Sequence, residues 1–282
     1  MPAQTVSLAW PEGEVAFVSL RDIITQDRQT LQSQRMFFLM DLDGKIGGFI
    51  QGTQNSLGFQ AAWSPDGTEI AIVASDEPTE SFCLKIISET RDECLVENAR
   101  GPSWSPDGKW LAYFMFSSRG SNDQIFAMDL DSREVILLAE LPSDKDDGDA
   151  SITTWAPDSG SVAYDVKMED GTENIWVVSL EKGDAQLLIS NGHLPAWSSR
   201  NEIAFRRDDQ IWLYDLKTGS ETLFLDFAED VSWPAWSPDG EQMLFTRNFN
   251  GQYDIFIVDR NGQNMRRLTE TEEDESAPSW RP

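Results

Sequence analysis

Short apolar segments separated by turn residues recur along the whole chain. In the last full unit these segments are residues 243–246, 254–259 and 265–269, and Asn261-Gly262 lies between the last two, where a hairpin turn requires positive φ. Each is four to six residues long and rich in β-branched and aromatic side chains, which is typical of strands rather than helices. Similar segments at 110–113, 125–128, 135–138, 162–164, 175–178, 203–205 and 211–214 predict strands in the preceding units.

A tryptophan followed by a tight turn marks each unit. Trp-Ser-Pro-Asp-Gly occurs at 63–67, 104–108 and 236–240, a close copy at 155–160, and weaker copies begin at Trp10, Trp197 and Trp280. Proline presets φ, aspartate bonds to nearby backbone, and glycine accepts positive φ, so the motif predicts a turn between two strands. Successive motif tryptophans are 53, 41, 51, 42, 39 and 44 residues apart, a period that fits four strands plus turns.

Six such units predict a closed ring, because one four-stranded unit cannot bury both faces and closure protects the strand edges. We therefore expect an all-β fold, a six-bladed β-propeller of four-stranded antiparallel blades, in one domain over residues 1–282. The expected blades cover 7–55, 59–98, 101–141, 151–190, 193–226 and 232–270, with a closing segment at 277–282. The pattern leaves open whether residues 7–10 or the C-terminal segment supplies the innermost strand of the first blade. The motif tryptophans are expected to pack between blades rather than bind a ligand.

The repeat resembles the TolB-type (PD40) propeller repeat. The residues that carry the resemblance are Trp236-Ser237-Pro238-Asp239-Gly240, Ile255-Phe256-Ile257-Val258-Asp259 and Leu268-Thr269. The resemblance covers nearly the whole chain, and it implies a periplasmic or extracytoplasmic location if a leader has been removed. The first residues, Met1 to Gln4, lack the basic-then-apolar build of a signal peptide, so a cytoplasmic location is the alternative.

Connection lengths distinguish the two faces of the expected ring. Turns between strands 1 and 2 and between strands 3 and 4 are short, whereas long connections at 21–35, 76–80, 117–123, 144–149 and 272–275 gather on the opposite face. Variable loops on a rigid scaffold are where binding usually occurs. The candidate partner-binding residues at the channel mouth on that face are Phe59, Arg100, Asp149, His193, Trp233 and Glu275.

Each candidate has a plain structural alternative. Trp233 lies outside the repeated tryptophan position, so it is either a surface anchor for a partner or a packing residue. His193 is the only histidine and is either solvated or a donor to a ligand. Arg100 either pairs with a carboxylate of a partner or balances nearby Glu97.

Composition narrows the class of partner. Acidic residues outnumber basic residues 49 to 22, giving a net charge of −27, which repels phosphate backbones and argues against nucleic acid. No apolar run is long enough to span a membrane. We expect a monomer that binds a protein or peptide.

Sequence signatures of catalysis are missing. The chain has no Gly-x-Ser-x-Gly elbow, and its single histidine cannot build a poly-histidine metal site. The acidic run 144–149 departs from the EF-hand order, although calcium at the acidic loops stays open. We therefore predict no catalytic residue, no cofactor and no metal site. The function expected is non-catalytic binding on the long-loop face. The alternatives are a hydrolase or lyase that acts on a small or sugar-like ligand with two carboxylates paired across the channel, for example Asp149 and Glu275, and one module of a larger assembly.

The two cysteines, Cys83 and Cys94, fall on neighbouring strands of one expected blade. The expected hairpin register places them off-register rather than opposite, which favours two buried free thiols over a disulfide. The cysteines therefore say little about the redox compartment.

Overall fold

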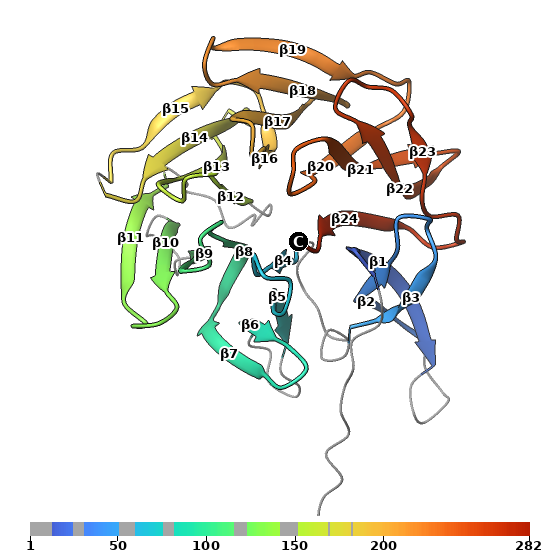
Figure 1. Ribbon diagram of the computed structural model, residues 1–282, viewed down its shortest axis with the longest axis horizontal. Coiled ribbons are helices and arrows are strands. Elements are labelled where there is room, and N and C mark those ends of the chain that lie inside the picture. The colour runs from blue at the N-terminus through green and yellow to red at the C-terminus, as the bar shows by residue number, and fades with distance from the viewer. Residues whose placement is uncertain are drawn as a thin grey trace, which may run out of the picture.

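The computed structural model describes residues 13–24, 31–50, 60–75, 82–115, 123–141, 152–168, 170–181 and 183–282. The strands of this part of the chain form six four-stranded antiparallel sheets arranged around a common centre (Figure 1). No helix occurs within the described residues. The predicted all-β, six-bladed propeller is confirmed.

Five blades take four consecutive strands each. The second blade contains β4 (Ala62–Trp63), β5 (Ile70–Ser75), β6 (Phe82–Ile87) and β7 (Asp92–Glu97), and the third contains β8 (Ala99–Trp104), β9 (Trp110–Met115), β10 (Gln124–Asp129) and β11 (Val135–Glu140). The fourth contains β12 (Thr153–Trp155), β13 (Ser161–Lys167), β14 (Glu173–Ser179) and β15 (Gln186–Ile189). The fifth contains β16 (His193–Trp197), β17 (Glu202–Arg207), β18 (Gln210–Asp215) and β19 (Ser220–Leu225), and the sixth contains β20 (Val231–Trp236), β21 (Gln242–Phe249), β22 (Gln252–Asp259) and β23 (Arg266–Arg267).

The first blade joins the two ends of the chain. Its strand order is β24 (Glu275–Trp280), β1 (Val15–Ile24), β2 (Leu31–Met40) and β3 (Ile46–Phe49). The C-terminal strand β24 therefore supplies the innermost strand, with Trp280 opposite Val15 and Glu275 opposite Ser19. Residues 7–10, the alternative for this position, lie outside the described residues. The pairing of β24 covers the inner edge of β1 and joins the two ends of the chain in one sheet.

The repeated turn has the same geometry in three blades. The serine hydroxyl donates to the aspartate two residues later, at 2.6 Å in Ser64–Asp66 and again in the copies at 105–107 and 237–239. Hydrogen bonds from the Ser64 hydroxyl, and then from Thr68, hold the pKa of Asp66 below its ordinary value. At Gly67 (φ 67°) a Cβ would approach the carbonyl oxygen of Pro282 to 2.9 Å, so a side chain does not fit.

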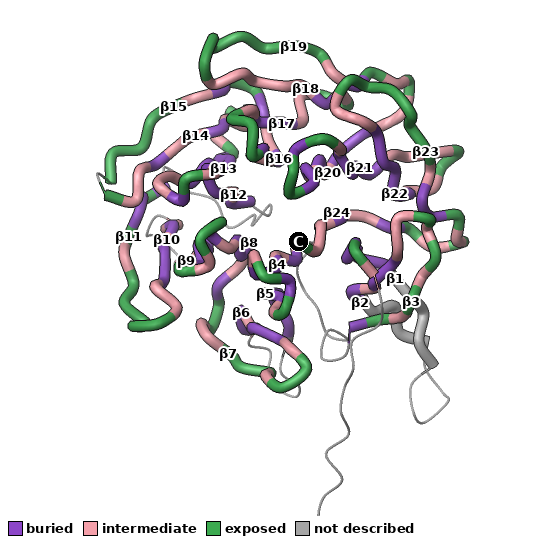
Figure 2. Tube along the Cα trace, in the orientation of Figure 1, coloured by how far each residue is buried: buried purple, intermediate pink, exposed green. Residues whose placement is uncertain are grey.

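The hydrophobic core lies between blades. Burial is densest in the inner and middle strands and gives way to exposed residues on the outermost strands (Figure 2). One cluster joins Phe114 of the third blade to Trp155 and Val178 of the fourth, and each motif tryptophan from Trp63 onward belongs to or packs against such a cluster. The predicted packing role of these tryptophans is confirmed.

Three connections on the face expected to carry long loops are short in the structure. Residues 21–35 are mostly hairpin, because β1 continues to Ile24 and β2 begins at Leu31. In the fifth and sixth blades the middle strands join through two-residue turns, such as Asn250-Gly251 with both residues at positive φ. Loop length therefore varies among blades on this face, rather than being uniformly long.

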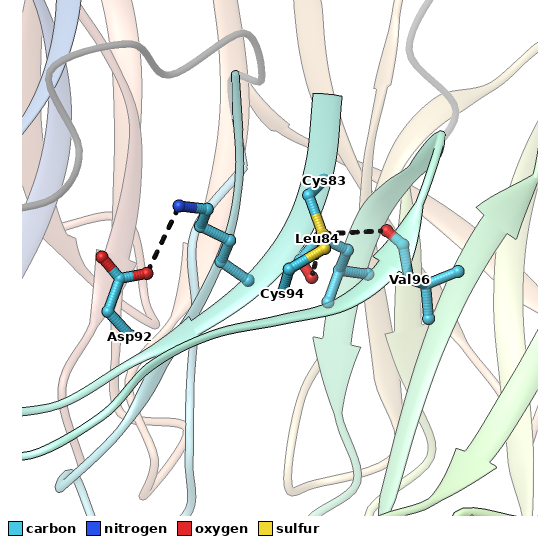
Figure 3. Close-up of a disulfide and its surroundings, with 6 residues drawn as sticks. Cys83, Leu84, Asp92, Cys94 and Val96 are labelled. Carbon is cyan, nitrogen blue, oxygen red and sulfur yellow. Dashed lines mark hydrogen bonds and ion pairs between the residues drawn. A yellow bond between two sulfur atoms is a disulfide. The ribbon is translucent and has the colours of Figure 1, made fainter. Parts of the chain in front are cut away.

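The prediction of two buried free thiols is wrong, because Cys83 and Cys94 form a disulfide (Figure 3). The expected diagonal register is present, with Cys83 opposite Glu97 and Cys94 opposite Lys85. A register shift at this point places one extra residue, Leu95, in β7 and brings the cysteine Cα atoms to 5.7 Å, inside the range a disulfide allows. Cys94 lies exposed on the outermost strand of its blade.

Candidate functional site

The innermost strands of the six blades, β4, β8, β12, β16, β20 and β24, lie around the centre of the ring (Figure 1). Residues on and beside these strands line a central cavity. Its volume is about 470 Å³, which is within the range of typical ligand sites. The wall repeats from blade to blade, because it is built from residues that flank each motif tryptophan. The contributing motif tryptophans are Trp63, Trp104, Trp155, Trp197, Trp236 and Trp280.

The side chains of the cavity wall are uncharged where the structure describes them. Seven tryptophans and eight prolines line it together with alanine, serine, threonine and a few larger neutral side chains, and none of these lining residues is Asp, Glu, Lys, Arg or His. This differs sharply from the rest of a chain with a net charge of −27. Such a wall favours apolar and aromatic groups and disfavours charged ones, which would lose their hydration without gaining a partner.

Hydrogen bonds between blades hold the wall in place. The hydroxyls of Ser103 and Thr153 lie 2.6 Å apart, and Thr153 also donates to the carbonyl of Gly101 at 2.9 Å. The indole of Trp155 donates to the carbonyl of Ser103 at 3.0 Å, and that of Trp280 donates to Ala235 at 2.9 Å. The motif tryptophans thus serve as packing residues and as part of the cavity wall.

Four inner strands carry an unusual backbone position three residues before the motif tryptophan. Gly101, Leu194, Trp233 and Ala277 have φ values of 58°, 53°, 54° and 49°, and each precedes a proline. Proline cannot donate to the strand ladder, and the pairing register shifts at these points. The left-handed conformation costs a non-glycine residue roughly 1–2 kcal/mol, so these bulges shape the wall at some expense of stability. The four X-Pro pairs are visible in the sequence and could have predicted the bulges.

Trp233 lines the cavity, and it is half-buried rather than a free surface anchor. Its side chain packs against the cluster that contains Ala61 of the second blade and Ala277 of β24. Because Trp233 itself belongs to the sixth blade, this packing joins the sixth blade to the cluster of the first and second blades. Among the candidate residues that the structure describes, Trp233 is the one that lines the cavity.

The other candidates lie apart from the cavity wall or outside the described residues. The guanidinium of Arg100 lies 4.6 Å from the centroid of the Phe82 ring, and burial lowers the pKa of Arg100 while Asp123 acts in the opposite direction. Glu275 is fully buried in the first blade and accepts a hydrogen bond from the hydroxyl of Thr271. Phe59 and Asp149 lie outside the described residues, so the proposed carboxylate pair has one member without a described position.

His193 belongs to a network of charged side chains where the fourth, fifth and sixth blades adjoin. Its Nδ1 lies 2.5 Å from the Glu173 carboxylate, and its Nε2 lies 3.3 Å from the Arg206 guanidinium. Arg206 also donates to Asp230 at 2.9 Å, and the Tyr253 hydroxyl donates to the same carboxylate at 2.9 Å. The only histidine is therefore an anchored part of a network and not a freely solvated side chain.

Asp165, on β13, is a buried carboxylate directly behind the cavity wall. It accepts hydrogen bonds from the backbone N–H of Ile152 at 2.7 Å and from that of Leu194 at 3.2 Å, and both of those residues line the cavity. Burial raises the pKa of Asp165 to about 6, against the opposing effects of these two hydrogen bonds and of His193. Sequence reasoning missed this residue. The available signal was a carboxylate inside the apolar strand Ser161–Lys167.

Relatives among curated proteins include longer peptidases. The chain is 26% identical over 220 residues to "Uncharacterized peptidase YuxL" of Bacillus subtilis, covering 70% of this chain and 31% of that protein. It is 24% identical over 185 residues to dipeptidyl-peptidase 5 of Porphyromonas gingivalis, covering 56% of this chain and 26% of that protein. The chain thus spans about a third or less of these two relatives.

Similarity to solved structures and to a family model concerns the propeller itself. The crystal structure of TolB from Acinetobacter baumannii superposes with a TM-score of 0.75 at 21% identity, covering 95% of this chain and 67% of that one. No helix in the described part of the chain has the length and hydrophobicity needed to cross a membrane. The model of the TolB β-propeller domain (PD40) matches residues 14–205, about two thirds of the chain. On this match and the six-bladed fold, the chain belongs to the TolB β-propeller family.

Proposed function

We propose that this propeller is a non-catalytic binding module that holds an uncharged, apolar segment of a protein or peptide partner in its central channel, with further contacts on the long-loop face. The observation that carries the proposal is the uncharged cavity of about 470 Å³ lined by tryptophan and proline in a strongly acidic chain. Aromatic walls gain free energy from apolar and aromatic groups and from proline rings. Trp233 is the proposed central contact, and Arg100 and His193 are proposed contacts at the mouth of the channel.

The described wall supports binding over hydrolysis. Acid–base cleavage of a sugar-like ligand requires two carboxyl groups in the pocket, and the described lining residues include no Asp or Glu side chain. A serine peptidase requires a histidine beside its nucleophile, whereas His193 contacts Glu173 and Arg206. The peptidase relatives match this chain over 31% and 26% of their own lengths, which is consistent with a shared binding module.

Selection from a phage-displayed random peptide library tests the proposal directly. Trp233→Ala removes the indole from the channel. Trp212→Ala is the matched control, because Trp212 is also half-buried but belongs to the middle strand β18 and is not part of the cavity lining. We expect the wild type and Trp212→Ala to enrich the same uncharged peptides rich in aromatic residues and proline, and Trp233→Ala to bind them at least about tenfold more weakly.

A second variant guards against misfolding of Trp233→Ala. Ser199 lines the cavity but is exposed in a turn, so Ser199→Glu adds a charge to the wall where the fold tolerates it. This variant should also lose the selected peptides. The proposal fails if the selected peptides are charged, or if both channel variants bind them as well as the wild type does.

A further inference from the structure

Asp165 joins the channel walls of two blades from behind. Its two carboxylate oxygens each accept one backbone N–H, Oδ1 from Ile152 beside the fourth blade's inner strand and Oδ2 from Leu194 in the fifth blade's inner strand. Both donors belong to residues that line the cavity, while Asp165 itself is 7% exposed and is not part of the lining. One side chain therefore fixes the spacing of two adjacent wall segments.

The wall segment of the fifth blade has an unfavourable backbone conformation at Leu194. Leu194 has φ 53°, a left-handed conformation that a leucine does not adopt without external support, and it precedes Pro195. The register of β16 against β17 shifts at this point, so the strand ladder does not hold the Leu194 backbone in place. The hydrogen bond to Asp165 supplies part of the missing support.

The surroundings of Asp165 contain few other charges. Glu173 on β14 and His193 on β16 act on it electrostatically, and His193 in turn contacts Arg206 on β17, which pairs with Asp209 and Asp230. Lys167 lies two residues further along β13. Strand β12 flanks β13 on the side opposite to β14, and its residues Thr153, Thr154 and Trp155 are all uncharged.

We propose that Asp165 is a positioning residue for the channel, and that its change of charge at mildly acidic pH loosens the channel wall of the fourth and fifth blades and weakens binding there. This inference rests on the proposed function for the binding step, but not for the effect on the wall. Hydrogen bonds from N–H groups to a carboxylate are stronger than those to a neutral carboxyl group, and protonation also converts one acceptor oxygen into a donor. Burial raises the pKa of Asp165 to about 6, so this change of charge falls in the mildly acidic pH range.

Backbone amide NMR tests the positioning role without any ligand. In the wild type the amide signals of Ile152 and Leu194 should shift together with a midpoint near pH 6, and in Asp165→Asn this shared titration should be absent. Asp254→Asn is the matched control. Asp254 is also fully buried, and burial raises its pKa, but it pairs with Arg267 instead of with the backbone of residues that line the cavity. A histidine can also titrate near neutral pH. His193→Gln, which should keep the shared shift, therefore assigns the titration to the carboxylate.

Binding of N-phenyl-1-naphthylamine, an uncharged fluorescent probe, tests the consequence for the channel. Its affinity should fall roughly three- to tenfold from about pH 7.5 to about pH 5 in the wild type and in Asp254→Asn, and stay constant in Asp165→Asn. Amide signals that do not titrate, or a probe affinity independent of pH while they do titrate, would overturn the inference and leave the proposed function intact. A probe that does not bind the wild type at either pH contradicts the channel site itself, and the amide titration then decides the positioning role alone.

Discussion

The inner wall and the outer rim of the ring are built on opposite principles. Inner strands are uncharged where they face the cavity, are joined across blades by hydrogen bonds, and include left-handed residues before proline. The outermost strands, at the other end of each sheet, carry more exposed residues than the inner and middle strands (Figure 2). The exposed large hydrophobic residues of the described chain all lie in or next to outermost strands: Phe49, Val135, Leu137, Leu187, Leu223 and Met265.

This difference indicates that substitutions are tolerated less well at the inner wall than at the outer rim. At the inner wall a side chain packs against neighbouring blades and the cavity at once, so a substitution alters two interfaces. At the rim a side chain contacts its own hairpin and water. Changes of equal size should therefore have large effects at the centre and small effects at the circumference.

Removal of the closing strand should have the largest effect. Deleting residues 277–282 removes most of β24, including Trp280 and its hydrogen bond to Ala235, and exposes the edge of β1. We expect the Tm to fall by more than about 10 °C, because an open ring loses the inter-blade core on both sides of the first blade. Differential scanning calorimetry measures this. A fall of only one or two degrees would show that the remaining contacts, not the pairing of β24, hold the ring closed.

A pair of substitutions in one blade compares centre and rim directly. Trp155→Ala removes a side chain that is 4% exposed and donates to Ser103, and should cost about 3–5 kcal/mol of unfolding free energy. Leu187→Ala, at a position 49% exposed on β15, should change it by less than about 0.5 kcal/mol. Urea unfolding of both variants gives the two values. Similar losses in the two would contradict the distinction between wall and rim.

The disulfide gives the rim one covalent constraint. It closes a short loop between β6 and β7, so its removal in a Cys83→Ala/Cys94→Ala double variant should cost about 2–3 kcal/mol. Thermal unfolding of the wild type with and without a reducing agent should show the same difference, and the double variant should not respond to the reducing agent. Two titratable thiols in the native, unreduced protein would show that the bond does not form.

Much of the fold could be predicted from the sequence because the repeat is local. The turn of Ser64 and Asp66 depends on residues within five positions of one another, and the strand segments follow from their own composition. The disulfide could not be predicted, because it depends on the register shift at Leu95, and a single extra residue in an edge strand leaves no periodic signal.

The candidate site was less predictable, because it depends on how six separate segments face one axis. Trp233 was selected because it departs from the repeat, and it lines the cavity. Arg100 and Glu275 are expected at the channel mouth, but bulges at Gly101 and Ala277 alter the strand geometry beside them, and neither residue lines the cavity. Asp165 follows from none of these rules, because its role comes from a neighbouring blade.

A smaller effect on stability than that of the disulfide concerns Asp165 and pH. Burial raises the pKa of this carboxyl group to about 6 from an ordinary value of 3.8, so between these values the folded protein binds more protons than the unfolded chain. The unfolding free energy contributed by this group is therefore fully present below about pH 4 and is lost as the pH rises through about 6. Between about pH 5 and pH 7.5 the unfolding free energy of the wild type should therefore fall by about 1–2 kcal/mol more than that of Asp165→Asn. Urea unfolding of both proteins at the two pH values measures this difference.

The predicted effects of acidification on the unfolding free energy and on the channel wall have opposite signs, so the two effects can be separated. Acidification through pH 6 should raise the global stability contributed by Asp165 while it weakens the local hydrogen bonds to Ile152 and Leu194. Asp259→Asn is a suitable control, because a hydrogen bond from Asn264 lowers the pKa of this exposed carboxylate, and the variant should keep the wild-type dependence above about pH 5. If the unfolding free energies of Asp165→Asn and the wild type change in parallel over this range, Asp165 does not change its charge between about pH 5 and pH 7.5, and the predicted loosening of the wall at mildly acidic pH does not occur.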